Sequence, residues 1–254
     1  MRAQVEICGC FPTGRHYPGI ADRLRAGAAA LDVRGLASGF EPDLDWVTGS
    51  FVVIDFETTG IEPGTDRIVE VGLACFDEGV ATVTQNWLVN PGMPIPETAT
   101  QVHGITEEMV KAEPRFEEVW PQIRPLLEGR LPVAYNANFD KRMLLAELER
   151  AGEATWGTHL PPSMQGEVEW IDPLVWAREL SEESQSARLG EVCARLGIAL
   201  ENAHRAMHDA EAAGKVLLAL APRMPRTYGE LIRVQVRYAA QQDVDMAVWR
   251  GRRF

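Results

Sequence analysis

The stretch FVVIDFETTG, residues 51–60, carries the most information about the fold of this 254-residue chain. Its first part is apolar and rich in β-branched residues, which predicts a buried strand over 51–57. Side chains alternate between the two faces of a strand, so Asp55 and Glu57 are expected to project from the same side. The following segment, 58–66, contains two glycines and a proline and predicts a turn.

The segments that follow extend this strand into a sheet and then into alternating strands and helices. RIVEVGLACF (67–76) and VATVTQNWLV (80–89) predict two strands, joined through the turn at Asp77-Glu78-Gly79 and therefore antiparallel. Further strands are expected at 131–137 and 168–172, and helices at 107–111, 116–127, 139–152, 173–180, 189–196 and 204–220. This order predicts an α/β fold of three layers, with a mixed five-stranded sheet flanked by helices.

The organisation of the chain predicts one main domain with an appendage at each end. Residues 1–48 are expected to form an accessory helix over 20–31 and a linker, because 36–50 is rich in Gly, Ser, Pro and Asp. The main domain is expected over 49–222, and 223–254 is expected to be a basic helical tail. The main domain holds 13 basic and 28 acidic residues, whereas 223–254 holds seven basic and three acidic ones.

Composition excludes several classes of protein. With 46% hydrophobic residues the chain is not a disordered one, and no apolar run approaches the roughly 20 residues that cross a bilayer. Four cysteines are too few for a disulfide scaffold, and the N-terminus does not resemble a secretory signal, so a soluble cytoplasmic protein is expected. The net charge of −12 argues against broad electrostatic capture of nucleic acid and is compatible with carboxylates that hold divalent cations.

The acidic residues suggest a metal site, although each has an ordinary alternative. Asp55 and Glu57 end an apolar strand, where bare charges are costly and a hard cation such as Mg²⁺ would offset that cost. The alternative is a solvated strand end. Asp140 opens a helix, which the helix dipole alone would favour. Asp209 is unexpected inside an Ala-rich helix, whereas His204 and His208 have the spacing of an ordinary surface pair.

Together, five segments resemble the DEDDh 3′–5′ exonucleases, the DnaQ-like family of the epsilon proofreading subunit of DNA polymerase III. They are FVVIDFETTG (51–60), VHGIT (102–106), VAYNANFDKRML (133–144), IDPLVWARE (171–179) and HRAMHDA (204–210), in the family's order. The resemblance covers about residues 50–222. His204, five residues before Asp209, matches the histidine subclass of the family. Tyr135 departs from the pattern, since family members commonly have His there, and we expect an altered substrate contact with retained chemistry.

The resemblance implies a ribonuclease-H-like fold and two divalent cations, Mg²⁺ or Mn²⁺. It implies that Asp55, Glu57 and Asp209 hold one cation, and that Asp55 and Asp140 hold the second. His204 would be the general base that deprotonates the attacking water, a task that suits imidazole. The residues implied to bind the substrate are Thr58, Thr59, Val102, His103, Asn136 and Phe139.

The resemblance also implies a substrate and a partner. We expect hydrolysis at the 3′ end of single-stranded or frayed DNA, with release of 5′-nucleoside monophosphates, in proofreading or repair. DNA polymerase III subunits are possible partners, and a stand-alone nuclease is as plausible as a proofreading subunit. The alternatives are an exoribonuclease that acts on RNA 3′ ends and a catalytically silent module that binds partners or nucleic acid. No membrane association is expected.

Overall fold

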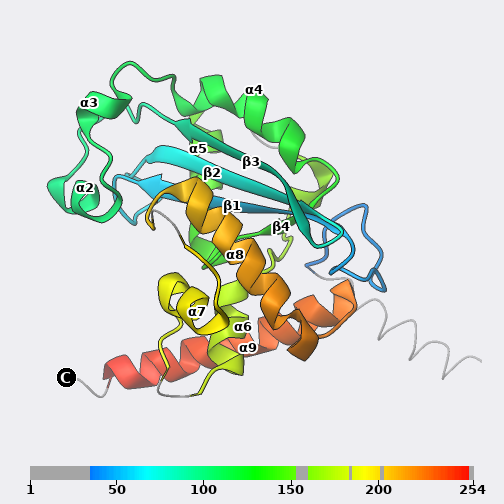
Figure 1. Cartoon of the computed structure of the whole chain (residues 1–254). Helices are drawn as coiled ribbons and strands as arrows, with labels where there is room; N and C mark the ends of the chain where they lie inside the picture. Colours follow the sequence, from blue (N-terminus) through cyan, green and yellow to red (C-terminus); the bar gives the residue numbers. More distant parts are fainter. Residues whose placement is uncertain (1–34, 153–159, 183–184, 201–202, 252–254) are drawn as a thin grey trace, which may run out of the picture.

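A four-stranded mixed sheet, in the order β3-β2-β1-β4, forms the centre of the molecule (Figure 1). The strands are β1 (Ser50–Thr58), β2 (Ile68–Asp77), β3 (Val80–Leu88) and β4 (Leu131–Val133). β1 pairs with β2 and β2 with β3 in antiparallel register, whereas β4 runs parallel to β1. The predicted antiparallel arrangement of the first three strands is therefore confirmed.

The structure of the chain, a computed structural model, describes residues 35–152, 160–182, 185–200 and 203–251. The accessory helix that the sequence predicts over 20–31 lies outside the described residues. In the part of the chain that is described, no helix has the length and apolar character needed to cross a membrane.

Helices cover both faces of the sheet. Figure 1 shows α8 lying across β1 and β2 on one face and α5 behind the sheet on the other. On that second face α4 also packs, since Cys75 of β2 is buried against it and its thiol contacts the carbonyl of Leu126. The helices are α2 (Glu97–His103), α3 (Glu107–Val110), α4 (Phe116–Leu127), α5 (Ala137–Arg150), α6 (Pro173–Leu180), α7 (Leu189–Leu196), α8 (Ala206–Leu220) and α9 (Tyr228–Gly251), with short 3-10 turns at Pro162–Met164 and Ala221–Arg223.

The expected fifth strand, 168–172, is wrong in extent. Only Ile171 pairs, through a single parallel bridge to Val133. The N–H of Ile171 donates to the carbonyl of Pro132, and the N–H of Ala134 donates to the carbonyl of Ile171. Pro132 has no N–H of its own to extend this ladder, and Asp172 turns away to begin α6. The expected strand at 131–137 likewise ends at Val133, and α5 begins at Ala137.

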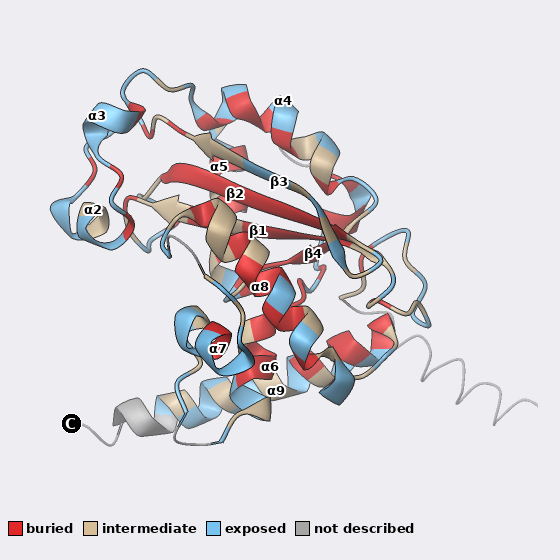
Figure 2. Cartoon of the chain, in the orientation of Figure 1, coloured by how far each residue is buried: buried red, intermediate tan, exposed pale blue. Residues whose placement is uncertain are grey.

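The C-terminal helix α9 packs against α6 rather than against the sheet. Gln235 of α9 is buried, where it accepts hydrogen bonds from the backbone N–H of Asp172 and from the indole of Trp176. Segment 35–49 packs at the start of α9, since the indole of the fully buried Trp46 donates to the carbonyl of Pro225. Figure 2 shows that α9 is buried at its first turns and exposed farther along, while β2 is buried almost throughout.

Two glycines allow α8 to approach the sheet closely. A Cβ added to Gly72 of β2 would lie 1.9 Å from the backbone carbonyl carbon of Ala206, at the start of α8. A Cβ added to Gly214 of α8 would lie 2.2 Å from the ring of Phe76, which stacks on Phe51. Since Gly72 pairs with Asp55 in the sheet, the first turn of α8 is held directly beside that carboxylate.

We predict that Gly72→Ala displaces the first turn of α8. Overpacking of this kind costs about 1–3 kcal/mol, so the melting temperature should fall by roughly 2–10 °C. Differential scanning fluorimetry measures the effect. Gly64→Ala is the matched control, because a Cβ at Gly64 meets no atom within 4 Å. Equal melting temperatures for both variants would contradict the close approach.

Candidate active site

Asp55 and Glu57 lie where β1 reaches the end of the sheet. Asp55 pairs with Gly72 and Glu57 with Glu70, so both acidic side chains lie on the face covered by α8. The register shifts between Glu57 and Thr58, and the strand ends there. Among the described residues, neither carboxylate accepts a hydrogen bond, so both are free to bind a ligand.

Asp140 reaches the same strand from its open edge. β4 pairs only with residues 51–53 of β1, so on this edge the later N–H groups of β1 have no strand partner among the described residues, whereas the other edge stays paired with β2. Asp140, 2% exposed in the first turn of α5, takes that place, and its Oδ1 accepts the N–H of Phe56 at 3.2 Å. The shortness of β4 therefore brings a third carboxylate next to Asp55.

Asp172, which the sequence analysis did not select, fixes the direction of α5. Its carboxylate accepts the N–H groups of Asn136 and Ala137, each at 3.0 Å, and that of Leu174 at 2.9 Å. It thus caps α5 and α6 together, and Asp140 follows one turn later. The Asp-Pro pair at 172–173 was the available signal, because Asp before a Pro at the first helical position is a common helix start.

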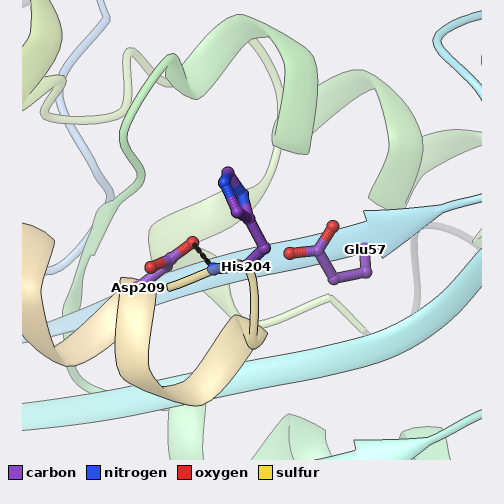
Figure 3. A group of neighbouring side chains, drawn as sticks. All are labelled: Glu57, His204 and Asp209. Carbon is purple, nitrogen blue, oxygen red and sulfur yellow. Dashed lines mark hydrogen bonds between the residues drawn. The ribbon is translucent and has the colours of Figure 1, made fainter. Parts of the chain in front are cut away.

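Asp209 and His204 complete the cluster from the start of α8. Asp209 lies in the first turn of the helix, and its Oδ2 accepts the backbone N–H of His204 at 3.1 Å. Its Oδ1 is buried and has no hydrogen-bond partner among the described residues. Potential ligand atoms of Glu57, His204 and Asp209 all lie within 4.8 Å of one another, and Figure 3 shows the three side chains around one space.

A buried ion pair that the sequence analysis also missed holds this helix start in place. Glu70 of β2 is fully buried, and its carboxylate accepts bidentate hydrogen bonds from the Arg205 guanidinium. It also accepts the backbone N–H of Ala206. Asn86 of β3 donates to the same carboxylate at 2.9 Å. The signal was a charge in the middle of the apolar strand 67–76, since a buried charge needs a partner.

The carboxylates raise one another's pKa. Burial raises the pKa of Asp55 well above its usual range, and the charges of Asp140 and Asp209 raise it further. Burial, together with Asp209 and Glu70, raises the pKa of Glu57 to about 8, although Arg205 opposes this. Burial likewise raises the pKa of Asp140 and of Asp209. Without a cation, the site therefore disfavours its own ionised form.

The donor set fits a hard divalent cation. Ligand atoms of Glu57, His204 and Asp209 lie close together, and the charges of Asp140, Asp209 and Glu57 act on Asp55. One buried carboxylate oxygen, Oδ1 of Asp209, lacks a partner in the described part of the chain. Carboxylate oxygens are the ligands that Mg²⁺ and Mn²⁺ prefer, and a bound cation would favour the ionised forms that burial opposes. Asp55, Glu57, Asp140 and Asp209 are the residues that would hold it.

The residues expected to bind substrate lie around this cluster in different environments. Val102 of α2 is 57% exposed and lines a cavity of about 1050 Å³ that His204 and Asp209 also line. Asn136 is exposed at the start of α5 with a left-handed backbone, φ 76°. Phe139 is partly buried and packs against the core.

The other three are engaged in local structure. Thr58 Oγ1 donates to the carbonyl of Gly60, and Thr59 is 2% exposed with its hydroxyl donating to Asp66. His103 is 5% exposed, and its Nδ1 accepts the N–H of Ile105. These contacts fix the turns at 58–66 and 103–105, and the first of these turns directly follows Glu57.

Comparisons with known proteins point in one direction. The RNase_T family model, described as an exonuclease, matches residues 52–217. The chain is 31% identical over 195 residues to a PolC-type DNA polymerase III of Thermotoga petrophila. The aligned stretch covers 77% of this chain and 14% of that polymerase. A PolC-type DNA polymerase III of Streptococcus pneumoniae is 31% identical over 189 residues, 74% of this chain and 12% of its own length. The chain thus spans about an eighth of these relatives.

Solved structures share the fold. Exonuclease X, in complex with 5′-overhanging duplex DNA, superposes with a TM-score of 0.56 and 25% identity over 73% of this chain and 99% of its own. A structure of exonuclease I gives a TM-score of 0.56 at 22% identity, over 69% of this chain and 42% of its own, and shows the fold alone.

We predict that the cation-free protein loses stability as pH rises and that Glu57→Gln weakens this loss. Between the usual glutamate pKa of roughly 4.3 and about 8, the folded chain keeps a proton on Glu57 that the unfolded chain has lost. Stability in EDTA therefore falls as pH rises through this window. At pH 8.5 in EDTA the variant should melt above the wild type, whereas Mn²⁺ should stabilise the wild type more.

Glu149→Gln serves as the control, because Glu149 is exposed on α5. It should melt like the wild type in both buffers. If Glu57→Gln melts below the wild type in EDTA at pH 8.5, or gains as much from Mn²⁺, the cluster does not behave as described.

Proposed function

Because the chain belongs to the DEDDh exonuclease family, we propose that it is a metal-dependent 3′–5′ exonuclease that shortens DNA from its 3′ end. Its substrates are single-stranded or frayed ends, its products are 5′-nucleoside monophosphates, and its role lies in proofreading or repair. The observation that carries this proposal is the meeting of Asp55, Glu57, Asp140 and Asp209 beside His204. Three elements far apart in the sequence supply these side chains.

Each residue of the cluster has a separate task. Asp55, Glu57 and Asp209 would hold one divalent cation, and Asp55 with Asp140 a second. When bound, the cations neutralise the carboxylates and stabilise the charge that develops on the attacking and leaving oxygens of an in-line displacement at phosphorus. Asp140 is held to the backbone of β1 and Asp209 to that of His204, so both are in place before substrate arrives.

His204 is the general base of this proposal. Its side chain is exposed, and a ring nitrogen lies within 4.8 Å of carboxylate oxygens of Glu57 and Asp209. Its backbone N–H donates a hydrogen bond to Asp209. It takes a proton from the attacking water as the water oxygen bonds to phosphorus. The bond from phosphorus to the 3′ oxygen of the preceding nucleotide breaks, and that oxygen is protonated from solvent. One nucleoside monophosphate leaves, and a new 3′ hydroxyl ends the strand.

The choice of DNA rests on the relatives. The polymerases that match are DNA polymerases, and exonuclease X is recorded with duplex DNA. Association with DNA polymerase III subunits follows from the same similarity and belongs to this proposal. An exoribonuclease would use the same cluster, because RNA and DNA differ at the 2′ position and not in the phosphodiester. A silent binding module is disfavoured, since every carboxylate of the cluster and the histidine are present.

The proposal predicts shortening of a 5′-labelled single-stranded DNA from its 3′ end in Mg²⁺ or Mn²⁺, read as a ladder on a denaturing gel. EDTA should stop it. His204→Ala should reduce kcat by about 10²–10⁴-fold, the usual contribution of a general base. His208→Ala, which changes a histidine in the first turn of α8 that is not part of the cluster, should retain activity.

A matched RNA separates the alternatives. Faster shortening of RNA than of DNA would replace the DNA proposal with an exoribonuclease. Cleavage of neither nucleic acid by a protein that Mn²⁺ stabilises would favour the silent module.

A further inference from the structure

The acidic cluster creates a problem for a nuclease, because a nucleic acid strand is itself an anion. The main domain holds 28 acidic residues against 13 basic ones, and the strand must approach several carboxylates at once. Bound cations offset repulsion at the scissile phosphate only. Affinity for the rest of the strand therefore requires cationic side chains close to the cluster and outside it.

The cavity beside His204 and Asp209 contains such side chains. It has a volume of about 1050 Å³ and lies between α2, α6, α7 and the start of α8. Arg178 of α6 and Arg188, which precedes α7, both line it. Both are exposed, and in the described part of the chain neither guanidinium forms an ion pair. Figure 1 shows α2 beside the end of the sheet at which α8 begins, and α7 below the sheet, next to α6.

The charge of the cavity favours an anion once cations occupy the cluster. Among the described residues that line it, Asp209 and Glu191 are acidic, and Asp209 belongs to the cluster. Outside the cluster, the described lining thus holds one acidic residue, Glu191, and the two arginines Arg178 and Arg188. The charge of Arg178 also lowers the pKa of Asp172, which places the guanidinium close to the joint cap of α5 and α6.

The apolar walls of the cavity suit nucleobases, and a hydrogen bond of Tyr135 fixes one of these walls. Leu174, Leu189 and the exposed Val102 supply apolar surface. The hydroxyl of Tyr135 donates to the carbonyl of Ala187 at 2.5 Å, so it ties the turn before α5 to the residue that precedes Arg188. This hydrogen bond fixes a wall of the cavity.

We propose, resting on the proposed function, that this cavity binds the nucleotides that precede the 3′-terminal one, with Arg178 and Arg188 on their backbone phosphates. The terminal nucleotide lies at the carboxylate cluster, and the strand leaves between α2 and α7. The two arginines are binding residues for the strand and take no part in the hydrolysis. A substrate with a single nucleotide therefore does not reach them.

Two substrates test the proposal. A ten-residue oligothymidylate extends through the cavity, whereas thymidine 5′-(p-nitrophenyl phosphate) offers one nucleotide and releases p-nitrophenol. Arg178→Ala and Arg188→Ala should each lower kcat/KM on the oligonucleotide by roughly fivefold to tenfold and change it less than twofold on the ester. The slope of log affinity against log salt should become shallower by about 0.7 for each phosphate that an arginine no longer neutralises.

Arg237→Ala is the matched control, since Arg237 is exposed on α9, outside the cavity. It should leave both substrates unaffected, and thermal melts should show that all three variants fold. If Arg178→Ala and Arg188→Ala lower kcat/KM equally on both substrates, or lower it on neither, the proposal is overturned.

Failure of the proposed function has a different signature. In that case the wild type hydrolyses neither substrate. Binding of a fluorescently labelled form of the same oligothymidylate, measured by anisotropy in Mn²⁺, then tests the cavity site without turnover. Weaker binding by the two cavity variants than by the wild type supports the cavity site. Equal binding overturns it.

Discussion

The burial of several carboxylates next to one another at the end of β1 is the constraint on which the rest of the structure depends. Burial and neighbouring charges raise the pKa of Asp55, Asp140 and Asp209, and that of Glu57 to about 8. Such a cluster persists only because packing elsewhere holds it together. Three contacts supply that packing. At Gly72 α8 approaches the sheet closely, and Glu70 forms a buried ion pair with Arg205. On the edge that β4 leaves open, Asp140 accepts the N–H of Phe56. The fold contributes stability here, and the cluster costs stability until a cation binds.

Much of this was accessible from the sequence. The spacing of apolar residues and the turn residues predicted the three antiparallel strands, α4, α6 and α7 to within a residue or two. The comparisons confirm the exonuclease family that the spaced motifs indicated. The five-stranded sheet was wrong, because a single Pro132 limits the pairing of the last segment to one bridge. Local pattern also does not reveal partners far apart in the sequence. Glu70 and Arg205 are 135 residues apart, so the pair became evident only in the folded chain.

The roles assigned to individual site residues stay predictions, and the structure sharpens them. The hydroxyl of Thr59 and Nδ1 of His103 fix turns, whereas Nε2 of His103 is buried and has no hydrogen-bond partner among the described residues. Val102 and Tyr135, in contrast, face the cavity beside the cluster. Under our two proposals the molecule divides its tasks, with carboxylates at one end of the cavity for chemistry and arginines farther along it for the strand. Such a division would allow an acidic chain of net charge −12 to bind an anionic strand.

Calorimetric titration of the full chain with Mn²⁺ at pH 8, in the absence of nucleic acid, tests the central claim most directly. We predict saturable binding of two ions per chain, with proton release as the carboxylates of raised pKa ionise. In Asp55→Asn, which removes the carboxylate common to both proposed ligand sets, that binding should be abolished or much weakened. Absence of binding to the wild type, or equal binding by the variant, would contradict the claim that this cluster is a divalent-cation site.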